Sequence, residues 1–231
     1  MDRLIFHGHS CTEIVTGDGT RLLVDPFLAG NNPAATVGPD HFHDRLDAVL
    51  LTHGHFDHVA DAWDLLARTG ARLIATFEIV SYAAEKLGHE NGHGMNVGGA
   101  HDFPFGRVKL TPAIHTGTLN AEGGEAYTST PHGFLLETDG TRIYHAGDTA
   151  LTRDLELLRG RVDVALLPIG DNFTMGPEDA ARAVEMIEPR TVIPIHYDTW
   201  PLIAQDTGAF RALVEPRADV VVLRPGESWD F

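Results

Sequence analysis

The sequence Leu50-Leu51-Thr52-His53-Gly54-His55-Phe56-Asp57-His58 contains four potential metal ligands within its last six residues. The apolar run that leads into it, residues 48–51, predicts a short buried strand. Gly54 allows a tight turn as the backbone leaves that strand, and residues 60–68 predict a helix. The imidazoles and the carboxylate are therefore expected at the carboxyl end of a strand, where open α/β sheets bind ligands.

The donors in this stretch indicate more than one metal ion. Neutral imidazole and carboxylate are the ligands that borderline and hard divalent metals prefer. Adjacent Asp57 and His58 cannot easily share one metal with both His53 and His55, so the cluster predicts two metals close together. A histidine-rich surface loop is the alternative, but four such donors at a strand end, with glycine at the bend, are hard to reach by chance.

The overall composition restricts the classes of function. The chain has 231 residues and a formal net charge of -16, which argues against broad nucleic-acid binding because that needs a basic face. Two divalent cations would reverse the local charge, so a small anionic substrate stays compatible. The single cysteine, Cys11, excludes a disulfide framework. With no signal-peptide core and no membrane-spanning stretch, a cytoplasmic protein without membrane contact is expected.

The second half of the chain repeats the plan of the first. Residues 134–145 predict a hairpin with the turn Asp139-Gly140-Thr141-Arg142, which matches Asp18-Gly19-Thr20-Arg21 in the hairpin of residues 13–24. Two further pairs of apolar runs match in the same order: 46–51 with 162–167, and 72–76 with 191–195.

This repetition predicts one domain, 1–231, with two pseudo-repeated halves of roughly 1–100 and 101–231. The expected fold is α/β (α+β): a four-layer αβ/βα sandwich of two mixed β-sheets flanked by helices. A plain doubly wound parallel sheet is the alternative, and the two hairpins count against it because hairpins are antiparallel.

Three further donors follow apolar runs. His115 follows residues 110–114, Asp148 follows 143–145, and His196 follows 192–195. Each has an ordinary explanation when taken alone, since a histidine at a strand end is often structural and Asp148 beside Gly147 fits a turn or a helix cap.

Taken together, the donors resemble a known pattern. The order H-x-H-x-D-H, then His, then Asp, then His, resembles the metallo-β-lactamase fold superfamily. The chain also resembles, over nearly its whole length, a family of bacterial and archaeal metal-dependent hydrolases close to the ascorbate-6-phosphate lactonase type. The motifs that carry this likeness are His7-Gly8-His9-Ser10, Asp25-Pro26-Phe27, His93-Gly94-Met95-Asn96-Val97-Gly98-Gly99, and residues 167–176.

The resemblance implies a division of the donors between two metals. It implies that one metal is bound by His53, His55 and His115, that the other is bound by Asp57, His58 and His196, and that Asp148 bridges both. Imidazole at His55 favours hydrolysis, because the superfamily's di-iron oxygen reductases resemble a variant with an acidic residue there. Zinc or manganese is expected, and iron is compatible, since no thiolate belongs to the set.

The expected reaction is hydrolysis. Two metals that share a water lower its pKa to roughly 7, so hydroxide is available to attack a small ester, lactone or phosphodiester. The catalytic candidates are Asp57, which would orient the hydroxide and take its proton, and Asp148. One alternative is an RNA or nucleotide phosphodiesterase or nuclease of the same superfamily, which the acidic balance disfavours. Another is a metal-bound sensor without turnover, which the complete ligand set disfavours. A homo-oligomer is compatible with the sequence.

Further residues are candidates for supporting roles. Asp25, His7 and His9 are candidates to support the ligands, with a strand-ending aspartate and structural histidines as the alternatives. The candidate substrate contacts are His93, Asn96, Asn172, Thr174 and Tyr197, and helix capping is the alternative for Thr174. An apolar wall is predicted from Met95, Phe173, Met175 and Trp200, for which ordinary packing is the alternative. Residues 118–130 predict a rim or lid.

Overall fold

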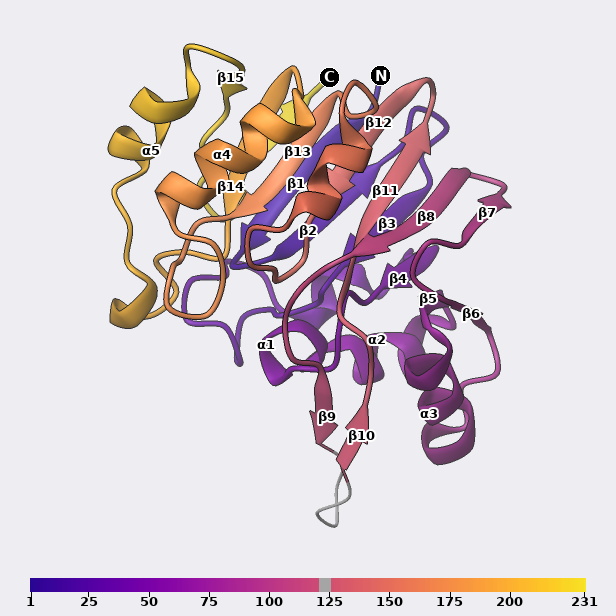
Figure 1. Cartoon of the computed structure of the whole chain (residues 1–231). Coiled ribbons are helices and arrows are strands. Elements are labelled where there is room, and N and C mark those ends of the chain that lie inside the picture. The colour runs from indigo at the N-terminus through magenta and orange to yellow at the C-terminus, as the bar shows by residue number, and fades with distance from the viewer. Residues whose placement is uncertain (121–125) are drawn as a thin grey trace.

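Two seven-stranded mixed sheets face each other and carry helices on their outer sides, as the computed structural model of residues 1–120 and 126–231 shows (Figure 1). The first sheet has the order β16-β1-β2-β3-β4-β5-β6, and the second the order β15-β14-β13-β12-β11-β8-β7. The four-layer α/β sandwich is thereby confirmed, and the plain doubly wound sheet is excluded.

The bounds of the elements are as follows. The first sheet contains β1 (Arg3–Gly8), β2 (Cys11–Val15), β3 (Arg21–Val24), β4 (Ala48–Leu50), β5 (Arg72–Thr76), β6 (Gly92–Met95) and β16 (Ser228–Asp230). The second contains β7 (Ala100–Phe103), β8 (Gly106–Pro112), β11 (His132–Thr138), β12 (Thr141–His145), β13 (Val164–Pro168), β14 (Thr191–Ile195) and β15 (Asp219–Val220). The helices are α1 (Phe56–Val59), α2 (Ala62–Thr69), α3 (Phe77–Leu87), α4 (Pro177–Ile187) and α5 (Thr207–Val214), with 3-10 turns η1 (Pro39–Phe42), η2 (Arg153–Leu158) and η3 (Pro201–Ile203).

The two sheets share one pattern of strand directions. In the first, β16, β1, β2 and β3 pair antiparallel, and β3, β4, β5 and β6 pair parallel. In the second, β7, β8, β11 and β12 pair antiparallel, and β12, β13, β14 and β15 pair parallel. The predicted hairpins are β2–β3 and β11–β12. Because parallel strands end at a common edge, the loops that follow them lie near one another.

The core explains why the central strands are apolar on both faces. Successive side chains of a strand point to opposite faces. In β4, Ala48 and Leu50 join the cluster between the sheets, whereas Val49 joins the cluster under α2 and α3. Helix α2 buries Ala62, Leu65 and Leu66 against the same outer face, at helical spacing.

Two elements differ from the sequence-based expectation. The helix expected over 60–68 is α2, and the short helix α1 precedes it. Between them lies Asp61, whose carboxylate accepts from the Leu28 backbone N–H at 2.7 Å and from the Asn31 amide at 2.9 Å. Residues 89–99 are rich in glycine, and their sequence predicts a loop, but they contain strand β6. A Cβ on Gly92 would lie 2.5 Å from Val80 Cγ1, so glycine permits α3 to pack closely on this strand.

The predicted rim, 118–130, contains the strands β9 (Thr118–Asn120) and β10 (Ala126–Thr128), which pair antiparallel. They project from the body of the molecule below α1 and α2 (Figure 1). Residues 121–125 lie outside the described part of the chain, so the rim role stays a prediction. None of the helices in the described ranges is long and apolar enough to span a bilayer.

Candidate metal centre

The seven predicted donors meet where strands of both sheets end. The segment after β4 brings four of them, and the loops after β8, β12 and β14 bring His115, Asp148 and His196. Oδ2 of Asp148 lies at the centre: its distances to the Nε2 atoms of His53, His58, His115 and His196 are 4.0, 3.4, 3.5 and 3.1 Å. Strand ends that are far apart in sequence therefore present their donors to one carboxylate.

One group of donors consists of His53, His55 and His115, each of which offers one ring nitrogen, and these three atoms lie within 4.8 Å of one another. Nδ1 of His55 is 3.0 Å from Nε2 of His53 and 3.3 Å from Nε2 of His115. Because Nδ1 of His55 faces the group, its Nε2 is free to donate to Thr116 Oγ1 at 3.3 Å. The three rings thus aim at a shared point beside Asp148.

A second group consists of Asp57, His58, His196 and also His9, again with donor atoms within 4.8 Å of one another. Oδ2 of Asp57 lies 3.8 Å from Nε2 of His58, 3.7 Å from that of His196 and 3.0 Å from that of His9. The sequence suggested a supporting place for His9, and the structure puts its ring against this group.

Asp25 orients a candidate ligand in each group. Its Oδ2 is 2.8 Å from His58 Nδ1 and accepts from the Thr52 hydroxyl at 2.7 Å, while its Oδ1 accepts from the Thr52 backbone N–H. Because the single hydroxyl proton of Thr52 goes to Asp25, Thr52 Oγ1 accepts from His53 Nδ1, 3.0 Å away. In their neutral form, both histidines therefore carry their proton on Nδ1 and present a bare Nε2 to the centre.

The structure does not bring His7 to the donors that the sequence suggested it supports. Its Nε2 lies 3.1 Å from Oε2 of buried Glu13, and its ring packs edge-on against Phe42. By alternation alone, His7 and His9 would point to the same face of a continuous strand. Because β1 ends at Gly8 and the chain turns there, their side chains part, and His9 reaches Asp57.

Three residues at strand ends adopt the left-handed backbone region that non-glycine residues rarely occupy. They are His9 (φ 58°), Asp25 (φ 49°) and His196 (φ 54°). The backbone N–H of His196 donates to the His9 carbonyl at 2.7 Å, which ties two of these bends together. Such outliers cost free energy and cluster at functional sites.

The electrostatics of the centre favour bound positive charge. Burial alone would raise the pKa of Asp148, but His196 and His58 outweigh it and hold that pKa well below its usual range. Burial alone would lower the pKa of His196, but Asp148 raises it to about 9. Burial lowers the pKa of His53 well below its usual value. The carboxylates of Asp148 and Asp57 thus favour a protonated His196 when no other cation is present.

Several buried donors lack hydrogen-bond partners within the described ranges: His58 Nε2, His196 Nε2 and Asp148 Oδ1. An unpartnered buried polar atom is costly unless something else satisfies it. Neutral imidazole and carboxylate fit zinc, manganese or iron, so the residues present fit the metals that the sequence implied.

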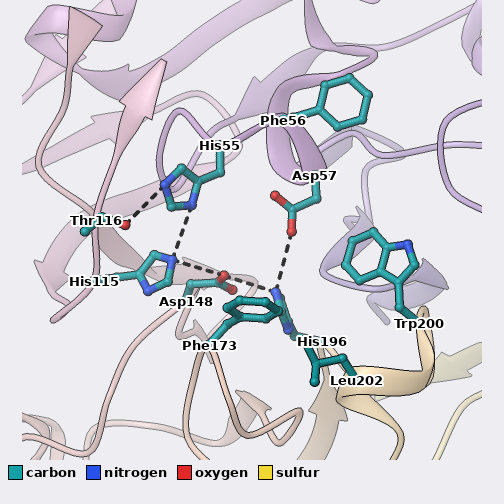
Figure 2. A pocket seen from close by; sticks show the side chains of 10 residues that line it. All are labelled: His55, Phe56, Asp57, His115, Thr116, Asp148, Phe173, His196, Trp200 and Leu202. Atoms are coloured by element: carbon teal, nitrogen blue, oxygen red, sulfur yellow. Dashed lines mark hydrogen bonds and ion pairs between the residues drawn. The ribbon is translucent and has the colours of Figure 1, made fainter. Parts of the chain in front are cut away.

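A cavity of about 620 Å³ opens over these donors (Figure 2). Its lining comprises His55, Phe56, Asp57, His115, Thr116, Asp148, Phe173, His196, Trp200 and Leu202. Phe173 and Trp200 of the predicted apolar wall are among them. Phe56, Thr116 and Leu202 were missed, although Phe56 lies inside the decisive histidine turn itself. Met95 and Met175 are instead buried in the core.

The structure does not bring the five predicted substrate contacts to this cavity. His93 lies on the edge strand β6, with its ring 4.2 Å from that of His101. Asn96 follows β6 in a turn, and its carbonyl accepts from Gly99 N–H. Tyr197 lines a separate hollow behind His9.

The remaining two of the five lie in the loop between β13 and α4. Asn172 is exposed with a left-handed backbone (φ 43°), and the Thr174 hydroxyl donates to the Met175 carbonyl at 3.2 Å. The predicted substrate contacts are thus polar residues of turns and of an edge strand. Sequence alone does not distinguish such residues from residues that contact a substrate.

Comparisons with known proteins find similarity to metal-dependent hydrolases. A family model described as a beta-lactamase superfamily domain matches residues 20–197. A UPF0173 metal-dependent hydrolase of Desulfitobacterium hafniense (strain Y51) is 46% identical, over 96% of each chain. One from Enterococcus faecalis (strain ATCC 700802 / V583) is also 46% identical, over 97% of this chain and 98% of that one.

Among solved structures, Igni18, described as a novel metallo hydrolase from the hyperthermophilic archaeon Ignicoccus hospitalis KIN4/I, superposes with a TM-score of 0.85. It is 32% identical, and the match covers 100% of this chain and 99% of that one. None of these names specifies a lactonase, so the likeness to the ascorbate-6-phosphate lactonase type stays a prediction.

Proposed function

Because the chain belongs to the UPF0173 metal-dependent hydrolases of the β-lactamase superfamily, we propose that it is a binuclear hydrolase of small ester, lactone or phosphodiester substrates. His53, His55 and His115 would hold one divalent metal, and Asp57, His58 and His196 the other. Asp148 would bridge them.

The observation that carries this proposal is the position of Asp148 Oδ2. It lies within 4.0 Å of four imidazole nitrogens that belong to both donor groups, whereas Oδ2 of Asp57 contacts three. A carboxylate in this position is suited to contact two cations at once. The bare Nε2 atoms of His53 and His58 supply neutral ligands on either side of it.

When bound, two such metals supply a water of lowered pKa and polarise the bond under attack. The chain's own residues would then accept a proton from the water and hold the donor side chains in place. Asp57 is partly buried and faces the cavity, so its carboxylate is placed to take a proton from the attacking water. His9 Nε2, 3.0 Å away, donates to Asp57 and holds it in place. Thr116 fixes the ring of His55.

The test begins with the metal content of the purified protein. We expect about two divalent ions per chain, their loss with a strong chelator, and turnover restored by zinc, manganese or ferrous iron on a panel of esters, lactones and phosphodiesters. Asp148→Ala should abolish turnover and lower the metal content. Asp102→Ala, at an exposed carboxylate on β7, is the matched control and should change neither. Full turnover by metal-free Asp148→Ala would refute the proposal.

A further inference from the structure

The walls of the cavity differ in character from one side to the other. On one side His55, His115 and Thr116 lie together (Figure 2). Large apolar side chains line the cavity as well, and they come from three separate segments: the start of α1 (Phe56), the loop between β13 and α4 (Phe173), and the turn around η3 (Trp200 and Leu202). Independent segments thus place large apolar side chains at one opening.

These side chains are unusually exposed for their size. The exposed fractions are 65% for Phe56, 51% for Phe173 and 62% for Leu202. Contiguous exposed apolar surface beside polar groups marks a binding surface. A buried residue supports it from behind: the ring of Phe27 lies 5.9 Å from that of Phe56 and 6.1 Å from that of Trp200.

The cavity offers neither lysine nor arginine to an anionic substituent. Within the described ranges, the ionisable side chains of its lining are the carboxylates Asp57 and Asp148 and three histidines, all of which belong to the donor groups. The metals would compensate an anion at the reacting centre, but not one held against the apolar wall. An unpaired charge placed there would lose its hydration without gaining a partner.

From this wall we propose the substrate class: an uncharged carboxylic ester or lactone whose aromatic or aliphatic group packs against Phe56, Phe173, Trp200 and Leu202. The proposal rests on the hydrolase function and narrows it, and it disfavours phosphodiesters with a charged backbone. In the reaction, the oxygen of one water bonds to the carbonyl carbon and the acyl–oxygen bond breaks. The leaving alkoxide takes one proton of that water, and the acid formed releases the other to solvent.

The test uses two esters that differ only in one charge. Nitrophenyl butyrate and nitrophenyl hemisuccinate share the leaving group and the length of the acyl chain, but only the second carries a carboxylate. With the metal-loaded protein, and after subtraction of spontaneous hydrolysis, we expect kcat/KM to favour the butyrate by about tenfold or more. Equal rates, or a preference for the hemisuccinate, would overturn the inference.

A charge placed on the wall should change this preference. Leu202→Lys puts a cation at the rim, so the preference for butyrate should fall by about tenfold, mainly through KM. Leu157→Lys is the matched control, because Leu157 is 67% exposed and lies on η2, outside the cavity lining. A preference that changes equally in both variants would count against the wall.

A binding measurement keeps the substrate class separate from turnover. The probes are two amides, N-phenyl butanamide and N-phenyl succinamic acid. Their binding is measured by the quenching of tryptophan fluorescence, and the variant Trp200→Phe shows which part of the quenching comes from Trp200. Tighter binding of the neutral amide supports the inference even if no ester is hydrolysed, an outcome that would refute only the hydrolase function. Equal or tighter binding of the acid overturns the inference whatever the turnover.

Discussion

Asp25 is the carboxylate whose hydrogen bonds fix the neutral tautomer of two candidate ligands. It contacts His58 directly and His53 through Thr52, so its loss should disturb both donor groups. In Asp25→Asn, the amide can no longer accept from both neighbours with full strength. We expect metal affinity to fall by about 10- to 100-fold, measured by competition with a chromophoric chelator.

Asp2→Asn provides the comparison for this variant. Asp2 is also buried, but its oxygens accept from the Gly17 backbone and from Thr138, away from the donors. It should lower stability without changing metal affinity. If both variants weakened metal binding equally, the effect of Asp25 would be one of general destabilisation.

Buried Glu13 predicts a dependence of stability on pH. Burial alone would raise its pKa, but hydrogen bonds from His7 and Arg21 outweigh burial and hold the pKa below its ordinary value of 4.5. A depressed folded-state pKa contributes stability above the unfolded-state pKa, and this contribution is lost as pH falls through the folded-state value. Glu13→Gln should therefore cost about 2 kcal/mol at neutral pH.

The measurement is denaturant unfolding of wild type and Glu13→Gln at several pH values. The difference between them should be largest at neutral pH and should shrink as the pH falls below about 4. Glu137→Gln, on an exposed position of β11, should show little difference at any pH. A gap that stayed constant down to acid pH would show that packing, not charge, accounts for Glu13.

Sequence alone identified the seven donors, because their side chains suit metal binding better than most other roles. Imidazoles and carboxylates after apolar runs have few other uses in such number, and all seven predicted donors meet in the structure. The apolar lining was harder to predict, because Phe56 and Leu202 carry no chemical signature that separates a binding wall from ordinary surface. The polar candidates His93 and Tyr197 do not reach the cavity. His93 packs against His101, and Tyr197 lines the separate hollow behind His9.

The turn after β4 depends on the packing of the hairpin β9–β10. A Cβ on Gly54 would lie 2.8 Å from Leu119 Cβ and 2.9 Å from Leu119 N, so the strand would have to move. We expect Gly54→Ala to cost about 2 kcal/mol of unfolding free energy and to weaken metal binding by displacing His53 and His55.

Gly38→Ala is the matched control, since its Cβ would meet only the Ala29 carbonyl at 3.5 Å, an ordinary contact. Thermal unfolding and chelator competition on both variants decide the matter. Wild-type metal affinity in Gly54→Ala would show that the hairpin yields without disturbing the ligands.

Elements with strong periodicity were predictable and those set by tertiary contacts were not. The hairpins β2–β3 and β11–β12 follow from their local pattern. Strand β6 does not, because its glycines serve the approach of α3 and carry no strand signal of their own. The break between α1 and α2 depends on Asp61 contacts to a distant loop, which a local pattern does not contain.

Across the whole molecule, the candidate centre joins the two sheets. The loops of the first sheet carry Asp25 and the segment 53–58, while those of the second carry His115, Asp148 and His196. Both sheets have the same pattern of strand directions, so their loops meet at a common edge. Neither half contains a complete set of donors. Metal binding is therefore expected to couple the stability of one half to that of the other.

Metal removal tests this coupling. Metal bound only to the folded chain stabilises it by mass action, by about 4 kcal/mol at a free concentration a thousand times the Kd. Chelation should lower Tm, and refilling should restore it. Hydrogen exchange should rise in both halves at once, around residues 53–58 and around 147–148 and 196, because each donor group loses its shared cation. In Asp148→Ala, Tm should respond little to added metal. Metal content should be measured before and after chelation. If Tm did not change although the metal had been removed, or if hydrogen exchange rose in only one half, the two sheets would not be joined through this centre.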